Sequence, residues 1–347
     1  MVSLEDLFEK ARHVLVVAIG GGGDVASAAV VARALSRIGL KYTLASIAWE
    51  RFVVDPVPGP IRLSEIANAI EVCEHYALVD SESYAIRRGR VVVFQAVNAS
   101  RALGESIYVV DMHNGVQGYV KALEEIVENT GADHVVGVDV GGDSLANGCE
   151  NNLWSPLADW IGVAALAVVG GTLAVHAPGS DGELDTDYVI EQAYRYSARS
   201  GTLAVTSMSA SDIELLEHVL EFVKSEASRI PLLAARGFKG PANIRKGSRS
   251  VVVSPVHTLT FYLSARDVAE SVPPVKNLEK TGSLEEARKI LNEYGLYTEL
   301  DLEEDIEKLG LEPELISGDI LLELRARGLR RLSAKKQLYC SSSSLPA

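Results

Sequence analysis

The sequence predicts an α/β fold, in which a Rossmann-like, doubly wound and mostly parallel sheet carries a small C-terminal helical appendage. Short apolar, β-branched runs alternate with runs of helical spacing over about the first 270 residues, a pattern typical of a parallel sheet with helices on both faces. Several of the strand-like runs end in glycine, aspartate, histidine or glutamate. Beyond about residue 270 the chain is strongly charged and keeps a helical spacing. These features together predict one α/β domain with helices appended.

The strands and helices can be placed in order along the chain. The run from His13 to Ile19 is apolar, β-branched and ended by glycine, which predicts a buried parallel strand. Residues 25–38 have helical spacing, with alanine and leucine on one face. Further strands are expected over residues 42–47, 76–79, 91–94, 107–111, 134–140, 172–176 and 203–206, and further helices over residues 116–129, 156–169, 187–200 and 211–225. Three later segments, residues 230–237, 251–253 and 260–263, are expected to extend or cap the sheet.

Three regions are expected along the chain. Residues 1–270 form the Rossmann-like domain, and a pair of prolines marks its end. Residues 271–332 form the charged helical appendage, in which Ser283 and Glu286 have the spacing of a capping box that begins a helix. Residues 333–347 include a low-complexity run of serines and are expected to be disordered.

The charge balance narrows the classes of partner. Among 347 residues, Lys and Arg number 33 and Asp and Glu number 47, so the formal net charge is −14. This charge argues against unspecific binding to nucleic acid or to an anionic membrane. No apolar run reaches the roughly 18 residues that span a bilayer, and the N-terminus is acidic, unlike a signal peptide. We therefore expect a cytoplasmic protein, and the sequence leaves a homo-oligomer open.

The cysteine content argues against two further classes of protein. Cys73, Cys149 and Cys340 are too few and too scattered to predict a disulfide framework or a zinc site. Few Met and Cys residues, together with many charged residues, Val and Ala, suit a thermophilic source.

The first strand runs into four glycines and an aspartate, Gly20, Gly21, Gly22, Gly23 and Asp24. Glycines between a strand and a helix leave backbone N–H groups free to bind an anion such as a phosphate or a carboxylate. They can equally serve tight packing, with the aspartate as the helix N-cap. Neither the dinucleotide-binding fingerprint nor a P-loop is complete here. Because the aspartate would repel a bare phosphate, the ligand is expected to carry a cation, an amine or hydroxyls beside its negative charge.

A second motif follows the strand at residues 134–140. Asp139 and Asp143 flank Gly141 and Gly142, so the two carboxylates can converge on one cation or share one proton. With Glu150 they form an all-carboxylate set, which favours Mg²⁺ or Mn²⁺ over zinc. The alternative is a tight turn in which the aspartates bond to their own backbone.

Two histidines are candidates for acid–base catalysis. His113 lies near Asp111, which can orient it, and Asn114 follows in the same loop. His176 comes at the end of another predicted strand. Either histidine can instead be structural, since a lone histidine more often is.

Two further loops complete the candidate site. Ser180 and Asp181 lie in a glycine-containing turn that either contacts a ligand or is a plain turn. Glu50 and Arg51 follow Trp49, and these residues can line a binding pocket and supply a cation for an acidic substrate. Arg51 can also pair with a neighbouring carboxylate. The carboxyl ends of parallel strands share one edge of a sheet, so we expect these loops to converge. No nucleophile motif is convincing.

The combination resembles an archaeal family catalogued as a domain of unknown function. The motifs that carry it are the glycine run with its aspartate, Trp49-Glu50-Arg51, residues 139–143, and Ser155-Pro156-Leu157-Ala158-Asp159, and the resemblance covers roughly residues 10–265. It implies no established activity. A fainter similarity to D-glutamate cyclase-like proteins, through Gly141-Gly142-Asp143 and Glu150, implies a carboxylate substrate.

The sequence therefore predicts an enzyme that binds a small anionic metabolite at the glycine run. Asp139 and Asp143 would hold a divalent ion or move a proton, and His113 or His176 would act as the acid–base partner. Lyase, cyclase or hydrolase chemistry at a carboxylate or phosphate is expected, because no redox-cofactor motif is complete. The alternative is a non-catalytic nucleotide or metabolite sensor whose charged C-terminal helices contact a partner.

Overall fold

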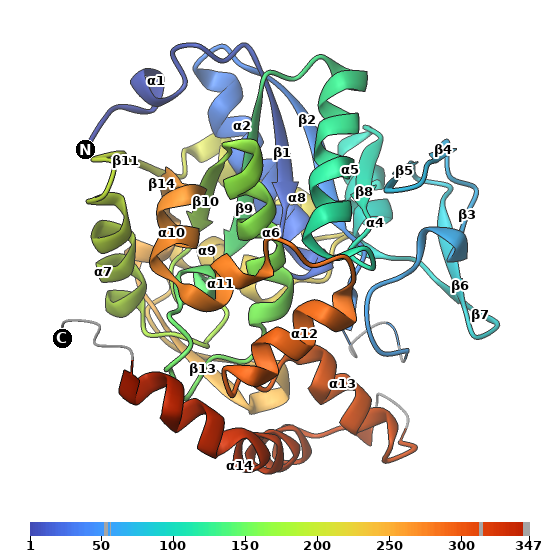
Figure 1. Ribbon diagram of the computed structural model, residues 1–347. Helices are drawn as coiled ribbons and strands as arrows, with labels where there is room; N and C mark the ends of the chain where they lie inside the picture. The colour runs from blue at the N-terminus through green and yellow to red at the C-terminus, as the bar shows by residue number, and fades with distance from the viewer. Residues whose placement is uncertain (52–54, 56, 312–314, 343–347) are drawn as a thin grey trace.

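A nine-stranded mixed sheet runs through the computed structural model, which describes residues 1–51, 55, 57–311 and 315–342 (Figure 1). The strand order is β11-β14-β10-β9-β1-β2-β8-β5-β4. The five central strands, from β10 to β8, are parallel to one another, and the outer strands β14, β5 and β4 are paired antiparallel to their inner neighbours. The strands of this sheet are β1 (His13–Ala18), β2 (Lys41–Ile47), β4 (Glu71–Val72), β5 (Tyr76–Val79), β8 (Ile107–Val110), β9 (His134–Val140), β10 (Thr172–His176), β11 (Leu203–Ser207) and β14 (Leu259–Ser264).

Strand β1 lies at the point where the order of the parallel strands reverses. The chain goes from β1 to β2 on one side, and it later returns to place β9 on the other side. In register, Val14 of β1 is paired with Tyr42 of β2 and with His134 of β9. Ligands of open α/β sheets bind beyond the carboxyl ends of the strands at such a reversal. The ends of β1 and β9 are therefore the expected position of a site.

Two hydrophobic layers cover the sheet, one on each face. Because side chains alternate along a strand, Leu15 and Val17 of β1 pack into one layer, whereas Val14 and Val16 pack into the other. The first layer is built with α5 (Gly115–Thr130), α6 (Pro156–Val169), α7 (Thr186–Ser197), α10 (Ala265–Ser271), α11 (Pro273–Leu278) and α12 (Leu284–Glu293). The second is built with α1 (Leu4–Leu7), α2 (Val25–Arg37), α4 (Gln95–Leu103), α8 (Ala210–Val219) and α9 (Glu226–Ala235). The predicted α/β class, with central parallel strands and C-terminal helices, is confirmed.

Several predicted elements differ from the structure. Residues 230–237, expected to extend or cap the sheet, lie mostly in helix α9, whose Ser225 N-cap accepts a hydrogen bond from the Ser228 N–H. Residues 91–94 were expected in the main sheet, but β7 (Arg90–Val92) instead pairs with β6 (Tyr84–Arg87) in a small sheet that β3 (Ile66–Ala67) completes. Short apolar runs do not specify their pairing partner, which tertiary contacts decide.

The C-terminal helices pack along one edge of the molecule (Figure 1). Helices α12 and α13 (Glu299–Glu307) precede the long helix α14 (Gly318–Ser342). The Glu299 carboxylate accepts hydrogen bonds from the Leu157 and Ala158 N–H groups at the start of α6, so the appendage contacts the main domain directly. Helix α14 includes the first ten residues of the segment expected to be disordered, whereas residues 343–347 lie outside the described residues.

The structure corrects the cysteine prediction. Cys149, in the loop after β9, is joined by a disulfide to Cys340 near the end of α14, and Cys73 is free. The two bonded residues are 191 positions apart in sequence, a separation at which spacing carries no pairing signal. Within the described ranges, no helix has the length and apolar character needed to cross a membrane.

Candidate functional site

The loops after β1 and β9 meet at the reversal of strand order. In the loop after β1, the Gly22 N–H donates to the Trp49 carbonyl at 2.9 Å and the Asp24 N–H donates to the Gly21 carbonyl at 3.0 Å. A Cβ atom on Gly20 would lie 2.2 Å from Asp24 Oδ2 and 2.9 Å from Asp159 Oδ1. The glycine at position 20 is therefore required by the close approach of two carboxylates.

Gly22 makes room for another carboxylate. A Cβ atom there would lie 2.5 Å from Oε1 of Glu50. The buried Glu50 side chain accepts hydrogen bonds from the Gln95 N–H at 3.0 Å and from Gln95 Nε2 at 2.9 Å. Burial raises the pKa of Glu50 to about 7, although these hydrogen bonds oppose the shift. The glycine run thus packs against acidic side chains of the protein itself.

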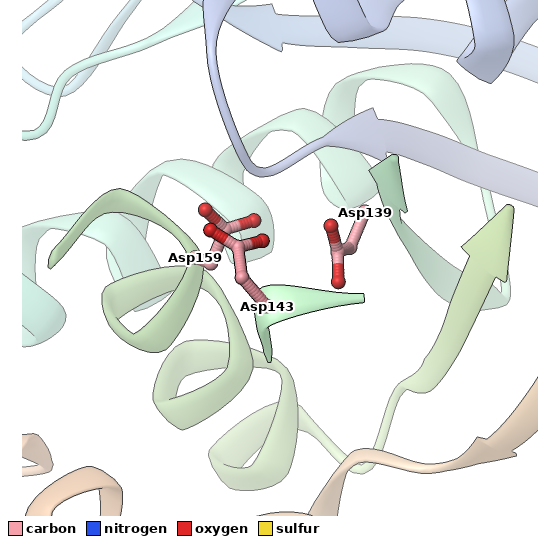
Figure 2. A group of neighbouring side chains, drawn as sticks. All are labelled: Asp139, Asp143 and Asp159. Carbon is pink, nitrogen blue, oxygen red and sulfur yellow. The ribbon is translucent and has the colours of Figure 1, made fainter. Parts of the chain in front are cut away.

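Three buried aspartates converge beside this loop, and we call them the open triplet: Asp139, Asp143 and Asp159 (Figure 2). Asp139 lies in β9, Asp143 follows the turn after it, and Asp159 lies in the first turn of α6. One carboxylate oxygen of each lies within 4.8 Å of those of the other two. Figure 2 shows the Asp143 and Asp159 carboxylates side by side, with Asp139 facing them.

Left-handed glycines produce this convergence. Gly141 and Gly142 have φ values of 122° and 98°, a conformation that residues with a Cβ rarely adopt. A Cβ on Gly141 would also lie 2.5 Å from Asp181 Oδ1. The sharp turn directs the chain back after β9, so that Asp139 and Asp143 belong to one cluster.

Hydrogen bonds from the protein stabilise only some of the carboxylate oxygens of the open triplet. Asp139 accepts hydrogen bonds from the Ser144 N–H at 3.2 Å and from the Ser144 hydroxyl. By contrast, Asp159 Oδ1 is buried without a hydrogen-bond partner among the described residues. Burial raises the pKa of Asp159 well above its usual value, and the charge of Asp139 raises it further. The pKa of Asp143 is raised by burial and by Asp159 in the same way.

Asp24 lies between this triplet and an adjoining cavity. It lines the cavity, and its carboxylate shares the space beside Gly20 with Asp159. Burial, followed by the charge of Asp139, raises the pKa of Asp24 to about 8, while Arg51 and Arg245 oppose the shift.

A second cluster, which we call the paired triplet, shares one member with the first. It consists of Asp143, Asp181 and Glu183. Glu183 accepts hydrogen bonds from the Ser155 N–H at 3.0 Å, from the Ser155 hydroxyl and from the Trp154 N–H, and it forms an ion pair of 2.9 Å with Arg249. Burial alone would raise the pKa of Glu183, but Arg249 and these hydrogen bonds lower it below its usual value. Glu183 is thus already satisfied by protein donors.

Asp181 Oδ2 of the paired triplet is also buried without a hydrogen-bond partner among the described residues, but Arg249 supplies positive charge to that cluster. Among the described residues, no Lys, Arg or His forms an ion pair with Asp139, Asp143 or Asp159, so the open triplet is the better candidate for a cation site. Mg²⁺ and Mn²⁺ prefer carboxylate oxygens, and Mg²⁺ binds them at about 2.1 Å. In both triplets the carboxylate oxygens lie within 4.8 Å of one another, so small movements bring three of them onto one ion. Buried carboxylates without partners are costly unless a cation or protons compensate them.

The adjoining cavity has a volume of about 550 Å³. It extends from the glycine run over Trp49, Glu50 and Arg51 to the segment that joins α8 and α9. The Arg51 guanidinium lies over the Trp49 ring, with Cζ 4.4 Å from the ring centroid, and Arg51 Nη1 lies 3.4 Å from Glu299 Oε1. The volume of the cavity is within the range of pockets that bind small molecules.

Both predicted histidines lie away from this cavity. His113 Nδ1 is 2.8 Å from Asp111 Oδ1, and Asn114 Nδ2 donates to Asp111 Oδ2 at 3.2 Å, at the end of β8. His176 is fully buried, with Nδ1 2.8 Å from the Thr260 hydroxyl, and burial lowers its pKa to about 4.

One of the remaining predicted residues lies in the paired triplet, and the others lie outside both clusters. Asp181 belongs to the paired triplet, where its Oδ2 is buried without a hydrogen-bond partner among the described residues, and Ser180 is buried next to it in sequence. Glu150 lies outside both triplets, where its carboxylate accepts hydrogen bonds from the Asn147 N–H at 2.7 Å, the Gly148 N–H at 2.8 Å and the Tyr188 hydroxyl.

Sequence reasoning left important residues of the site without a role. Asp159 stands in a helix that follows a Ser-Pro start, and its position in the first helical turn was the available signal. Glu299 and Glu303 come from α13, where both carboxylates are buried and Glu303 accepts from Trp49 Nε1 at 3.0 Å. Arg245 and Arg249 come from a hairpin far along the chain, and no local pattern marks them.

The comparisons with known proteins give a family and no activity. A family model described as a protein of unknown function (DUF1152) matches residues 15–307. The match extends beyond residue 265, where the resemblance carried by the sequence motifs ends, and it includes α13. No curated protein and no solved structure matches.

Proposed function

The chain belongs to this family of unknown function, DUF1152, and we propose that it is an enzyme that uses a divalent ion to act on a small anionic metabolite. The ion, Mg²⁺ or Mn²⁺, binds the open triplet, and the metabolite binds in the adjoining cavity. Hydrolase, lyase or cyclase chemistry at a phosphate or carboxylate fits the residues present, and hydrolysis requires only water as the second reactant.

One observation carries this proposal. Asp139, Asp143 and Asp159 bring buried carboxylate oxygens within 4.8 Å of one another, and Asp159 Oδ1 has no hydrogen-bond partner among the described residues. No Lys, Arg or His among the described residues forms an ion pair with the open triplet, whereas Arg249 forms one with Glu183 of the paired triplet. The unsatisfied oxygen points to a cation as the missing partner.

The protein's own residues supply the other parts of the chemistry. A bound divalent ion polarises an anionic group and lowers the pKa of a water ligand. Asp24 faces both the triplet and the cavity, so its carboxyl group is placed to take a proton from an attacking water or to return one to a leaving group. Arg51 holds positive charge at the same edge of the cavity. Neither His113 nor His176 lines the cavity, so the proposal gives the proton-transfer role to Asp24.

Turnover of a metabolite panel tests the proposal. The purified protein is incubated with sugar phosphates, nucleotides and amino acids, with and without Mg²⁺ or Mn²⁺, and products are measured by mass spectrometry. We expect metal-dependent conversion of at least one phosphate or carboxylate compound, reduced at least about 100-fold in Asp24→Asn. The matched control Asp187→Asn changes an exposed aspartate of α7 and retains full activity.

The sensor alternative predicts a different result. A sensor binds its ligand tightly and returns it unchanged. Ligand-dependent thermal stabilisation without metal and without any product would contradict the enzyme proposal.

A further inference from the structure

We propose that the cavity beside the open triplet is a phosphoryl-binding pocket, in which Arg51, Lys224 and Arg245 bind the phosphate group of a phosphorylated small metabolite. The inference rests on the proposed function, because it identifies the substrate class of the same site.

Four cationic side chains line the cavity. Arg51 follows β2, Lys224 and Arg229 lie around the start of α9, and Arg245 lies in the turn between β12 (Gly240–Ile244) and β13 (Arg249–Val253). The side chains of Lys224, Arg229 and Arg245 have no hydrogen-bond or ion-pair partner within the described ranges. Cations that are brought together around a cavity without acceptors favour an anionic ligand.

Arg245 is held in the cavity wall by its backbone. Its N–H donates to Glu226 Oε2 at 2.9 Å, and its carbonyl accepts from the Ser248 hydroxyl at 2.8 Å. Burial lowers the pKa of Arg245, and the charge of Arg249 lowers it further. A guanidinium destabilised by burial and by a like charge is stabilised when an anion binds beside it.

Two of the arginines that line the cavity share an unusual backbone. Arg51 and Arg245 have φ values of 54° and 51°. Left-handed backbone at residues with a Cβ is uncommon, and it is found preferentially at ligand-binding sites. Arg51 Nη1 is also buried without a hydrogen-bond partner among the described residues, and its ion-pair distance to Glu299 Oε1 is 3.4 Å. Both guanidinium groups are close enough to Asp24 to stabilise its charged form.

The acids that line the cavity leave these cations available. Glu217 is paired with Arg236, and Glu50 accepts both of its hydrogen bonds from Gln95. Glu226 accepts the Arg245 backbone N–H, and Glu221 lies 3.5 Å from His218. None of these carboxylates forms an ion pair with the four cavity cations in the part of the chain that the structure describes.

Phosphate fits this arrangement better than a carboxylate does. A single carboxylate offers two oxygens and one charge, whereas a phosphate monoester offers three oxygens and up to two charges. Arginine forks bind phosphate oxygens in pairs. The volume of about 550 Å³ leaves room for a metabolite of roughly nucleotide size behind the phosphate.

Titration of inorganic pyrophosphate by calorimetry tests the inference, with and without Mn²⁺. We expect wild-type protein to bind pyrophosphate in both conditions and at least about ten-fold more tightly with Mn²⁺. Arg245→Gln and Lys224→Gln should each weaken pyrophosphate binding at least about ten-fold and leave Mn²⁺ affinity within about two-fold. Arg33→Gln, which changes an exposed arginine of α2, is the matched control and should alter neither affinity.

The outcomes separate this inference from the proposed function. Equal pyrophosphate affinity in wild type, Arg245→Gln and Lys224→Gln, or the absence of pyrophosphate binding in both conditions, would overturn the inference. Tighter binding of succinate than of pyrophosphate would overturn it as well, in favour of a carboxylate substrate. Failure of Mn²⁺ to bind would contradict the proposed metal site instead, and pyrophosphate binding to the metal-free protein would still test the arginine pocket.

Discussion

The open and the paired triplets share Asp143 and each hold three buried carboxylates, yet among the described residues only the paired triplet contains an ion pair with a cationic side chain. In the paired triplet, Arg249, Ser155 and the Trp154 amide compensate Glu183. Asp159 of the open triplet and Asp181 of the paired triplet each keep a buried oxygen without a hydrogen-bond partner among the described residues, but no ion pair with a described residue compensates the open triplet. The number of neighbouring acids therefore does not define a metal site. The lack of a compensating cationic side chain is the better guide, because such a cluster gains most from an ion that the protein does not itself supply.

The pH dependence of stability should separate the two triplets most strongly. Asp24 beside the open triplet has a raised pKa of about 8, so folding favours its protonated form. Its contribution to stability is complete below the ordinary pKa near 4 and is lost as the pH rises through about 8. We expect the metal-free protein to lose about 5 kcal/mol of unfolding free energy across this window. Urea unfolding at a series of pH values measures it.

Glu183 in the paired triplet should act in the opposite direction. The pKa of Glu183 is lowered in the folded protein, so its contribution to stability is present at pH values above the ordinary pKa of glutamate. This contribution is lost as the pH falls through the lowered pKa.

The control for the loss of stability with rising pH is Asp24→Asn, in which most of that loss should disappear. The free energy of unfolding of the metal-free wild type should decline between about pH 4 and about pH 8. A constant value over this range would contradict the claim that the negative charges at the open triplet lack compensation.

Breaking the ion pair of the paired triplet should have the next largest effect. Glu183→Gln leaves the Arg249 guanidinium buried without its charge partner. We expect the unfolding free energy to fall by about 3–5 kcal/mol. Thermal and urea unfolding measure the change, and the exposed Glu191→Gln of α7 should leave stability unchanged. A loss no larger than that of the control would show that Glu183 is not held by the ion pair.

The disulfide supports the surroundings of the paired triplet. Helix α14 places Arg325 over the Trp154 ring at 4.4 Å, and the Cys149–Cys340 bond joins this helix to the loop after β9. Cys340→Ser should lower stability by about 2–4 kcal/mol without changing Mn²⁺ affinity. Cys73→Ser, at the free cysteine, is the matched control. A large loss of Mn²⁺ affinity in Cys340→Ser would mean that the open triplet also depends on α14.

Removal of a carboxylate from the open triplet should have a smaller effect, of opposite sign. Asp159→Asn removes a buried carboxyl group whose Oδ1 has no hydrogen-bond partner among the described residues. We expect the metal-free protein to gain about 1–2 kcal/mol at pH 8, because functional sites retain groups that destabilise the fold. Urea unfolding in the presence of a chelator measures the gain. A loss of stability comparable to that of Glu183→Gln would place Asp159 among the satisfied carboxylates.

The strand ends could be predicted from the sequence because local patterns encode them. Apolar runs that end in glycine and aspartate located Asp24, Asp139 and Asp143, and parallel strands bring such ends to one edge. The antiparallel insertion of β14 between β10 and β11 could not be predicted, since pairing depends on contacts far apart in the chain. The bond from Cys149 to Cys340 escaped prediction for the same reason.

The state of each carboxylate was also beyond local reasoning. Glu183 looks like a turn residue in sequence, but Arg249, 66 positions later, decides its charge. Glu150 has the spacing of a metal ligand, yet backbone N–H groups of its own loop satisfy it. Whether an acid is open or paired depends on donors that only the folded chain brings close.

Mn²⁺ binding to matched variants tests the central claim most directly. Free Mn²⁺ is followed by electron paramagnetic resonance during titration of the wild type, Asp159→Asn and Asp181→Asn. We predict one tight site in the wild type, a loss of affinity of at least about 100-fold in Asp159→Asn, and a change of less than about three-fold in Asp181→Asn. Equal losses in both variants, or unchanged affinity in Asp159→Asn, would contradict the assignment of the ion to the open triplet.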